Sequence, residues 1–153
     1  GGAYGDKPSA MKRFCTNFHR LPNSVKSRLT VENDDKASMY SVVDLYEGVY
    51  KVIGIPIVFD YHHHKFCTGG LSEEDALEVA ISTWVDIVPV VHYSESRSKE
   101  YEDDKIRPQA HSDYVLDYID TYGNRVDIMV EAKAKELAVL RYKEIHNDTR
   151  TNS

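Results

Sequence analysis

The sequence has few of the features that mark secreted or membrane proteins. It contains only two cysteines, Cys15 and Cys67, and they have neither zinc-binding nor redox spacing. Reduced thiols in an intracellular protein are therefore expected. No apolar run approaches the roughly 20 residues that cross a bilayer. No basic segment followed by an apolar one marks a signal peptide. We therefore expect no membrane contact.

An excess of basic residues is also lacking. Lys and Arg number 19 against 25 Asp and Glu, which gives a net charge of −6. This balance argues against a non-specific nucleic-acid binder, although bound cations would add positive charge where carboxylates are counted as negative. A hydrophobic content of 41% within 153 residues is typical of one globular domain with a real core.

Hydrophobic periodicity predicts five helices that alternate with four strands. The predicted strands cover residues 29–32, 55–60, 87–92 and 126–130. The first predicted helix begins at Asp6 or Lys7, and the second has a capping box at Ser41 and Gly54 at its end. A long polar segment, 93–110, follows the third strand, and such segments are usually functional or disordered.

Each of the five predicted helices has an apolar stripe that we expect to be buried. In the second helix the stripe includes Val52 and ends at Ile53. After Ser112 and Asp113, a capped helix is expected to bury Val115, Leu116 and Ile119. The last helix, from residue 132 to about 145, has a stripe formed by Ala134, Leu137, Ala138 and Leu140.

Strict alternation of helices and strands predicts an α/β fold with a parallel sheet. A complete (β/α)₈ barrel of the TIM type needs about 250 residues, so four βα units match half of one. The alternative is a doubly wound sheet, which needs a switch-point crevice and usually a phosphate loop. The sequence has no such loop, and ligand-type residues recur at the ends of all four strands, which favours the half-barrel.

Those strand ends are the strongest functional signal in the sequence. Alternation places Glu32, Asp60, His92 and Glu131 last on the inward face of successive strands. One carboxylate at a strand end is common and often structural. Four successive strands that deliver Glu, Asp, His and Glu are hard to attribute to chance. We interpret them as a divalent metal site.

The remaining candidates are weaker when judged one at a time. Among three consecutive histidines, spacing favours His63, because it lies three residues after Asp60 where the chain turns. His62 and His64 either support the ligands or lie at the surface. From spacing alone, His111 is as well explained as a helix cap or a surface histidine as it is as a metal ligand. Lys133 and Lys135 either meet phosphate or are merely exposed.

Seven strings, taken together and in order, resemble the UV damage endonucleases of the UvdE/UvsE type. They extend from the first residue to about residue 141. The strings are Gly1-Gly2-x-Tyr4-Gly5-Asp6-Lys7, Asn17-Phe18-His19-Arg20-Leu21-Pro22, Leu29-x-x-Glu32-Asn33-Asp34-Asp35, Gly54-Ile55-Pro56-x-Val58-Phe59-Asp60-x-His62-His63-His64, His92-Tyr93-Ser94, His111-Ser112-Asp113-Tyr114 and Glu131-Ala132-Lys133-Ala134-Lys135-Glu136.

The resemblance implies a barrel similar to endonuclease IV with two or three divalent ions per complete site, manganese being expected. It also implies the activity of the family, whose members nick UV-damaged double-stranded DNA on the 5′ side of photoproducts by hydrolysis, with no organic cofactor. Glu32, Glu131 and Lys133 would be catalytic. The implied metal ligands are Glu32, Asp60, His63, His92, His111 and Glu131.

The resemblance covers only the C-terminal half of the family's barrel. We therefore expect a partial barrel over residues 1–145, a disordered polar tail over 146–153, and a need for the N-terminal half to complete the site. One position departs from the family: Val90 stands where a modifiable lysine is expected near the metals. Two alternatives remain open, namely a metal-dependent sugar isomerase or epimerase on a similar barrel, and an inactive fragment.

Overall fold

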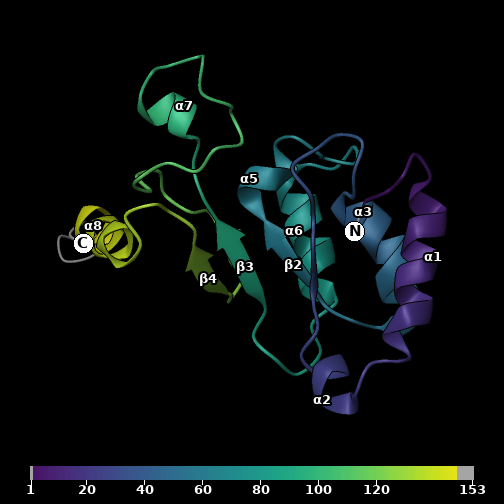
Figure 1. Cartoon of the computed structure of the whole chain (residues 1–153). Helices are drawn as coiled ribbons and strands as arrows, with labels where there is room; N and C mark the ends of the chain where they lie inside the picture. The colour runs from purple at the N-terminus through teal and green to yellow at the C-terminus, as the bar shows by residue number, and fades with distance from the viewer. Residues whose placement is uncertain (1, 148–153) are drawn as a thin grey trace.

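Four parallel strands form the centre of the protein, whose computed structural model describes residues 2–147. The strands lie in the order β1, β2, β3, β4, as Figure 1 shows for the last three. Their bounds are Val31–Glu32 for β1, Ile57–Asp60 for β2, Val90–Tyr93 for β3 and Asp127–Val130 for β4. All three pairs of adjacent strands are parallel. Strands that follow one another along the chain are also neighbours in the sheet.

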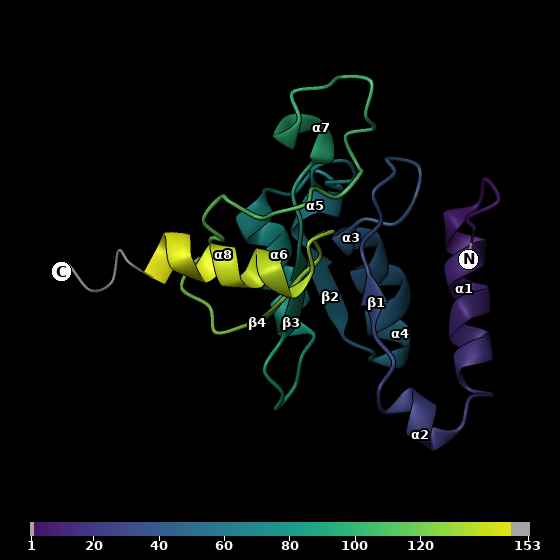
Figure 2. The same cartoon turned by 60° about the vertical axis from the view of Figure 1, so that its left-hand side comes forward.

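Helices α1, α4 and α6 lie together on one side of the strands, whereas α8 lies beyond β4 (Figures 1 and 2). Helix α3 continues through a π-helical turn, η1, into α4. The bounds are α1 Lys7–Phe18, α2 Asn23–Lys26, α3 Val42–Leu45, η1 Tyr46–Tyr50, α4 Lys51–Ile53, α5 Tyr61–His64, α6 Glu73–Ser82, α7 Arg97–Glu100 and α8 Glu136–Asn147.

Local sequence accounts for several of these boundaries. Helix α1 begins after Asp6, whose carboxylate accepts the Ser9 N–H at 3.1 Å. The predicted capping box is confirmed, because Ser41 and Asp44 exchange side-chain and backbone hydrogen bonds at the start of α3. Gly54 ends α4 with φ +75°, a conformation that glycine adopts without steric cost.

Alternation along β2 and β3 separates the core from the opposite face of the sheet. Phe59 and Val91 are register partners and are buried in the hydrophobic core beneath the helices. Asp60 and His92, the next pair, are directed to the other face. The core therefore holds the strands in register while their polar ends meet on the second face.

The predicted fold class is confirmed. The chain has an α/β fold with a four-stranded parallel sheet, which is consistent with half of a TIM-type barrel. Within residues 2–147, β1 and β4 each have a strand neighbour on one side only. The exposed side chains of β4 belong to this open arrangement, with Met129 53% exposed.

The helix predicted after Ser112 is wrong, because residues 112–122 form an irregular segment. The carboxylates of Glu95 and Glu100, which lie before and at the end of α7, accept hydrogen bonds from the backbone N–H groups of this segment. Glu100 accepts from Asp113 at 2.7 Å and from Tyr114 at 3.0 Å. Glu95 accepts from the N–H groups of residues 116 and 117. These bonds replace helical ones, and Leu116, expected to be buried, is 43% exposed.

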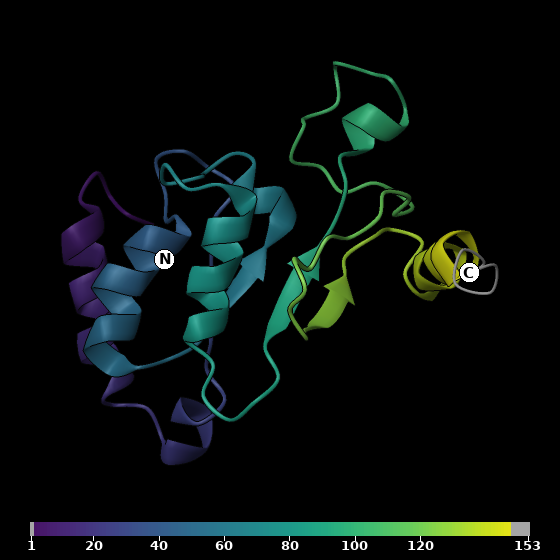
Figure 3. The same cartoon turned by 180° about the vertical axis from the view of Figure 1, so that it is seen from behind.

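The last helix begins later and continues further than predicted. Residues 132–135 form a turn in which Lys133 N–H donates to the Ser112 carbonyl. Helix α8 then extends to Asn147, and residues 148–153 of the predicted tail lie outside the described residues. Leu137 and Leu140 are both 55% exposed, because α8 lies beyond the edge strand β4 (Figure 3). Ala138, in contrast, is buried as predicted.

Three smaller expectations can also be compared with the structure. Val52 was expected in the buried stripe of its helix, but it is 61% exposed and borders an open cavity beside α1. Cys15 and Cys67 are both free, as predicted, and both are buried. Among the described residues, no helix has the length and apolar character needed to cross a membrane.

Candidate metal centre

The C-terminal ends of the four strands bring together the residues singled out by alternation. Strand register places Glu32 beside Val58 and His92 beside Asp60. Glu131 follows β4 directly, and its N–H donates to the Tyr93 carbonyl at 2.9 Å. The ligand-type side chains are therefore staggered along the sheet and converge over the end of β2.

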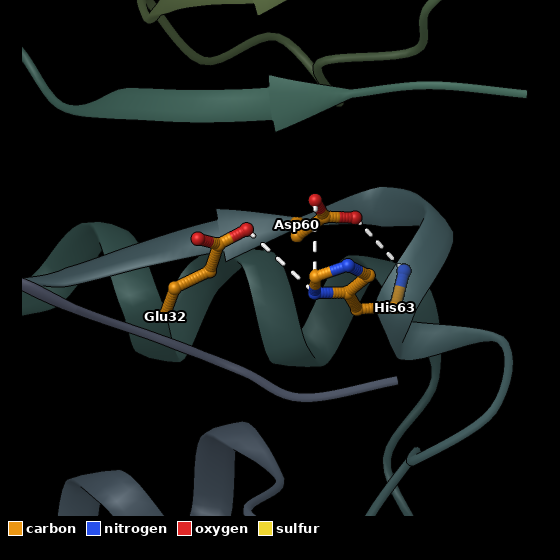
Figure 4. Close-up of side chains that lie close together, drawn as sticks. All are labelled: Glu32, Asp60 and His63. Atoms are coloured by element: carbon orange, nitrogen blue, oxygen red, sulfur yellow. Dashed lines mark hydrogen bonds and ion pairs between the residues drawn. The ribbon is translucent and has the colours of Figure 1, made fainter. Parts of the chain in front are cut away.

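One group of possible ligands consists of Glu32, Asp60 and His63, whose ligand atoms lie within 4.8 Å of one another. Figure 4 shows the three side chains directed toward one another. Nδ1 of His63 lies 3.6 Å from Glu32 Oε1 and 3.7 Å from Asp60 Oδ2. The predicted choice of His63 among the three histidines matches this geometry, since α5 turns its ring back over Asp60.

A second group consists of Asp60, His92 and Glu131, again within 4.8 Å. Nδ1 of His92 lies 3.2 Å from Glu32 Oε1 and 3.4 Å from Glu131 Oε1. His92 thus connects two carboxylates, and Asp60 belongs to both groups. The two groups form one continuous cluster across four strands.

His111 reaches the cluster from the loop that follows β3. An antiparallel bridge between Ser96 and His111 ties the end of the loop to its beginning. The His111 Nδ1 atom lies 3.8 Å from Glu131 Oε2. The position that spacing alone left undecided is therefore next to a candidate ligand. Figure 3 shows the loop, with α7, standing beyond the arrowheads of β3 and β4.

Asp60 is the centre of the cluster and is completely buried. Its Oδ1 atom accepts the His63 N–H at 2.8 Å, whereas its Oδ2 atom is buried without a hydrogen-bond partner among the described residues. Burial raises the pKa of Asp60 to about 7, because the charged form has lost its solvation. A buried carboxylate oxygen without a partner is costly unless a proton or a cation compensates it.

The pKa values of the neighbouring groups are shifted by the same cluster of charged side chains. The hydrogen bond to Glu32 raises the pKa of His92 above its ordinary value. Burial opposes protonation of His63, but Asp60 and the Asn33 carbonyl more than offset it, so the pKa of His63 is raised. Burial opposes ionisation of Glu32, yet the contact with His92 outweighs it and the pKa of Glu32 is lowered.

The donor set fits divalent cations. It combines carboxylate oxygens and imidazole nitrogens, which suit ions such as manganese. Nδ1 of His63 lies 2.7 Å from the Asn33 carbonyl oxygen, which can only accept, so Nδ1 carries the proton and Nε2 keeps its lone pair. A histidine ligand that donates its other N–H to a carbonyl is the usual arrangement around protein-bound metals.

Lys133 lies beside the cluster without belonging to either group. Its side chain is exposed, and it borders an open cavity of about 390 Å³ that is also lined by His111 and Glu131. Val90 is half-buried on β3, two residues before His92, and has no atom that could bind a cation.

Sequence reasoning missed the burial of two histidines. His62 and His64 are 1% and 4% exposed, so their assignment to the surface is excluded. Neither ring nitrogen of His62 has a hydrogen-bond partner within residues 2–147, and its ring lies 5.9 Å from that of His111. The short helix α5 turns these rings inward, and three identical residues in a row carry no periodic signal that would have shown it.

Comparison with known proteins identifies the family of the chain. A model of the family described as UV-endonuclease UvdE matches residues 1–151. The UV DNA damage endonuclease of Bacillus cereus strain Q1 is 38% identical over 93% of this chain and 45% of its own length. That of Bacillus pumilus strain SAFR-032 is 41% identical over 94% of this chain and 46% of its own length.

The fold comparison gives the same result. The crystal structure of SacUVDE superposes with a TM-score of 0.80 and 30% identity, covering 98% of this chain and 50% of that one. The chain thus spans about half the length of the relatives that it matches. Its matched residues, its sheet and its relatives agree: the chain belongs to the UV-endonuclease UvdE family.

Proposed function

We propose that the chain contributes half of the active site of a metal-dependent DNA repair endonuclease, which nicks the backbone 5′ to UV photoproducts. The observation that carries this proposal is Asp60. Its buried Oδ2 atom has no hydrogen-bond partner within residues 2–147 and lies where the two groups of possible ligands meet. The similar Bacillus proteins are UV DNA damage endonucleases, which supports the choice of substrate.

The residues that would hold two or three divalent ions, with manganese as the expected ion, form the cluster at the strand ends. They are Glu32, Asp60, His63, His92, His111 and Glu131. When bound, such ions lower the pKa of water toward neutrality and stabilise the negative charge that develops on the phosphate.

The side chains of the site bind and release protons and orient one another by hydrogen bonds. Asp60 retains its proton up to about pH 7 in the metal-free chain, so it exchanges a proton for a cation near neutral pH. His92 donates to Glu32 and lies near Glu131, which keeps both carboxylates oriented toward the centre. The Lys133 side chain, beside the cavity next to Glu131, is placed to meet a phosphate oxygen.

UV-damaged double-stranded DNA is the proposed partner. The net charge of −6 does not oppose this, because the bound ions add positive charge where the backbone would be cut. Distorted duplex is easier to bend and unstack than intact duplex, which favours damaged sites over normal ones. No membrane partner and no organic cofactor are proposed.

A complete site requires the other half of the barrel. Strands β1 and β4 each lack a second neighbour within residues 2–147, and the chain covers about half of its relatives. We therefore propose an N-terminal half as a partner, in the same polypeptide or supplied separately. An inactive fragment is the second candidate, and the exposed side chains of β4 favour it.

Incision of UV-irradiated plasmid with Mn²⁺ tests the proposal. The chain is assayed alone and with the complementary N-terminal half of the Bacillus cereus relative. We expect nicks beside photoproducts, and a loss of at least about 100-fold for Glu32→Gln and Glu131→Gln, since even outer partners of metal ligands cost 10–100-fold.

Glu47→Gln is the matched control, because Glu47 is an exposed acid on η1 that forms an ion pair with Lys51 at 2.9 Å. It should leave incision unchanged. Near-normal incision by both site variants would contradict the proposed site. If the folded chain makes no incision, either alone or with the N-terminal half, the second candidate, an inactive fragment, is supported instead.

A further inference from the structure

Asn33 is the first residue after β1 and is 1% exposed. Strand pairing between β1 and β2 ends one step earlier, where Glu32 lies beside Val58. Beyond that point the side chain of Asn33, not its backbone, continues the contact with β2. A buried asparagine is informative because each of its polar atoms needs a partner.

Both ends of the Asn33 side-chain amide bind the backbone of Asp60. Its Oδ1 atom accepts the Asp60 N–H at 2.8 Å, and its Nδ2 atom donates to the Asp60 carbonyl at 3.0 Å. The amide thus takes the place of a peptide group in the parallel ladder. It fixes the main chain of Asp60 from the β1 side, while β3 pairs with Asp60 from the other side.

The backbone carbonyl of Asn33 fixes a second candidate ligand. It accepts a hydrogen bond from Nδ1 of His63 at 2.7 Å. This bond selects the neutral tautomer in which Nε2 is free of a proton and can bind a metal ion. One buried residue is thus bonded to two members of the first ligand group, Asp60 and His63, and directly follows the third, Glu32, in the chain.

We propose that Asn33 is a positioning residue, which sets the geometry of Asp60 and the tautomer of His63 before any cation arrives. The inference rests on the proposed metal centre. Asn33 itself contributes no ligand, since all of its side-chain polar atoms are engaged with the Asp60 backbone. Its effect is on how well the ligands are preorganised, and preorganisation of ligands controls cation affinity.

Thr83 provides a matched control at the opposite end of the same strand. It is 2% exposed, and its hydroxyl accepts the Ile57 N–H at 2.9 Å and donates to the Ala80 carbonyl at 2.6 Å. Thr83 therefore anchors the start of β2 as Asn33 anchors its end. Thr83→Val removes a comparable anchor without changing the site. Asn33→Ala removes the anchor beside the ligands, and the isosteric Asn33→Asp removes its donor to the Asp60 carbonyl.

Two measurements test the proposal on the chain and these variants. The first is the NMR signal of the His63 Nδ1–H in the metal-free protein, assigned by its absence in His63→Gln. The second is Mn²⁺ binding, followed by the EPR signal of the free ion. We expect both Asn33 variants to lose or broaden the imidazole signal and to bind Mn²⁺ about 10–100-fold more weakly. Thr83→Val should retain both properties.

A structural role alone predicts another pattern, in which Thr83→Val and the Asn33 variants are affected equally. That pattern, or Asn33 variants that keep both the signal and the affinity, would overturn the proposal. If Asn33→Ala does not fold, Asn33→Asp carries the comparison because it keeps the shape of the side chain. If the wild-type chain binds no Mn²⁺, the metal centre fails, and the imidazole signal still decides the role of Asn33.

Discussion

His92 Nδ1 lies 3.2 Å from Oε1 of Glu32, although the two residues are 60 positions apart and their strands are not neighbours in the sheet. Strand β2 lies between them and ends at Asp60. The side chains of β1 and β3 therefore meet above the carboxylate of β2. This contact is the clearest sign that the inward residues of separate strands form one site.

Glu32→Gln should lower the pKa of His92. The hydrogen bond to Glu32 is the largest reason that the pKa of His92 is raised, and an amide cannot supply the negative charge. NMR titration of the His92 ring in the metal-free chain measures this directly. We expect a decrease toward the ordinary value in Glu32→Gln and no change in Glu47→Gln. A His92 pKa unaffected by the first variant would contradict the described contact.

The metal-free chain should lose stability as the pH rises toward 8. Unfolded Asp60 ionises near 3.8, whereas burial raises its folded pKa to about 7. Between these values the folded state holds more protons, so its stability falls with increasing pH, by up to about 1.4 kcal/mol per unit for one proton. The raised pKa values of His63 and His92 act in the same direction, because their stabilisation is lost as the pH rises through the folded values.

Glu32 acts oppositely, since its lowered pKa gives stability above about 4.5 that is lost in acid. Urea unfolding from about pH 5 to about pH 8 lies above the range in which Glu32 titrates, so it measures the decline caused by the raised pKa values. We expect Asp60→Asn to flatten the decline, and Mn²⁺ to stabilise the wild-type chain more at the higher pH because ligands must be deprotonated. An equally steep decline in Asp60→Asn would exclude Asp60 as its source.

Glu100→Ala should release the segment that carries His111. The Glu100 carboxylate accepts the N–H groups of Asp113 and Tyr114, and no helix protects these groups. Hydrogen exchange at both amides should become faster, by about 10-fold or more, since a hydrogen bond to a charged acceptor contributes about 1.5–3 kcal/mol. Glu74→Ala is the control, because this exposed acid lies on α6, away from the loop. Equal exchange rates in both variants would refute this role.

Gly69→Ala should destabilise the chain more than Gly70→Ala. Both glycines have positive φ, +59° and +84°, which costs another residue about 1–2 kcal/mol. A Cβ on Gly69 would also lie 2.7 Å from the Cβ of Ser41, the residue that caps α3, whereas one on Gly70 would meet nothing within 4 Å. Thermal unfolding of the two variants compares them directly, and equal losses would show that the Ser41 contact is unimportant.

The sequence was sufficient for the sheet and for the residues at its strand ends. Alternation with a period of two depends only on local geometry, so Asp60 and His92 could be placed on one face without a structure. The irregular segment after Ser112 could not be predicted in this way. Its backbone N–H groups bind Glu95 and Glu100, residues that have no periodic relation to it. Ser112 and Asp113 are residue types that often cap helices, so they wrongly indicated a helix start.

The supporting residues were missed for a related reason. Asn33 stands in for a peptide group, and its role depends on where β1 stops pairing with β2. The exposure of Leu137 and Leu140 depends on what covers α8. Periodicity identifies a face that is apolar, but it does not show whether a second element lies against that face.

Anomalous diffraction from crystals of the chain soaked in Mn²⁺, recorded at the manganese absorption edge, is the most direct test of the metal centre. We predict peaks at the strand ends, between Asp60 and the side chains of Glu32 and His63, and between Asp60, His92 and Glu131. The absence of anomalous density at Asp60, in crystals that show an intact cluster, would contradict the proposed centre.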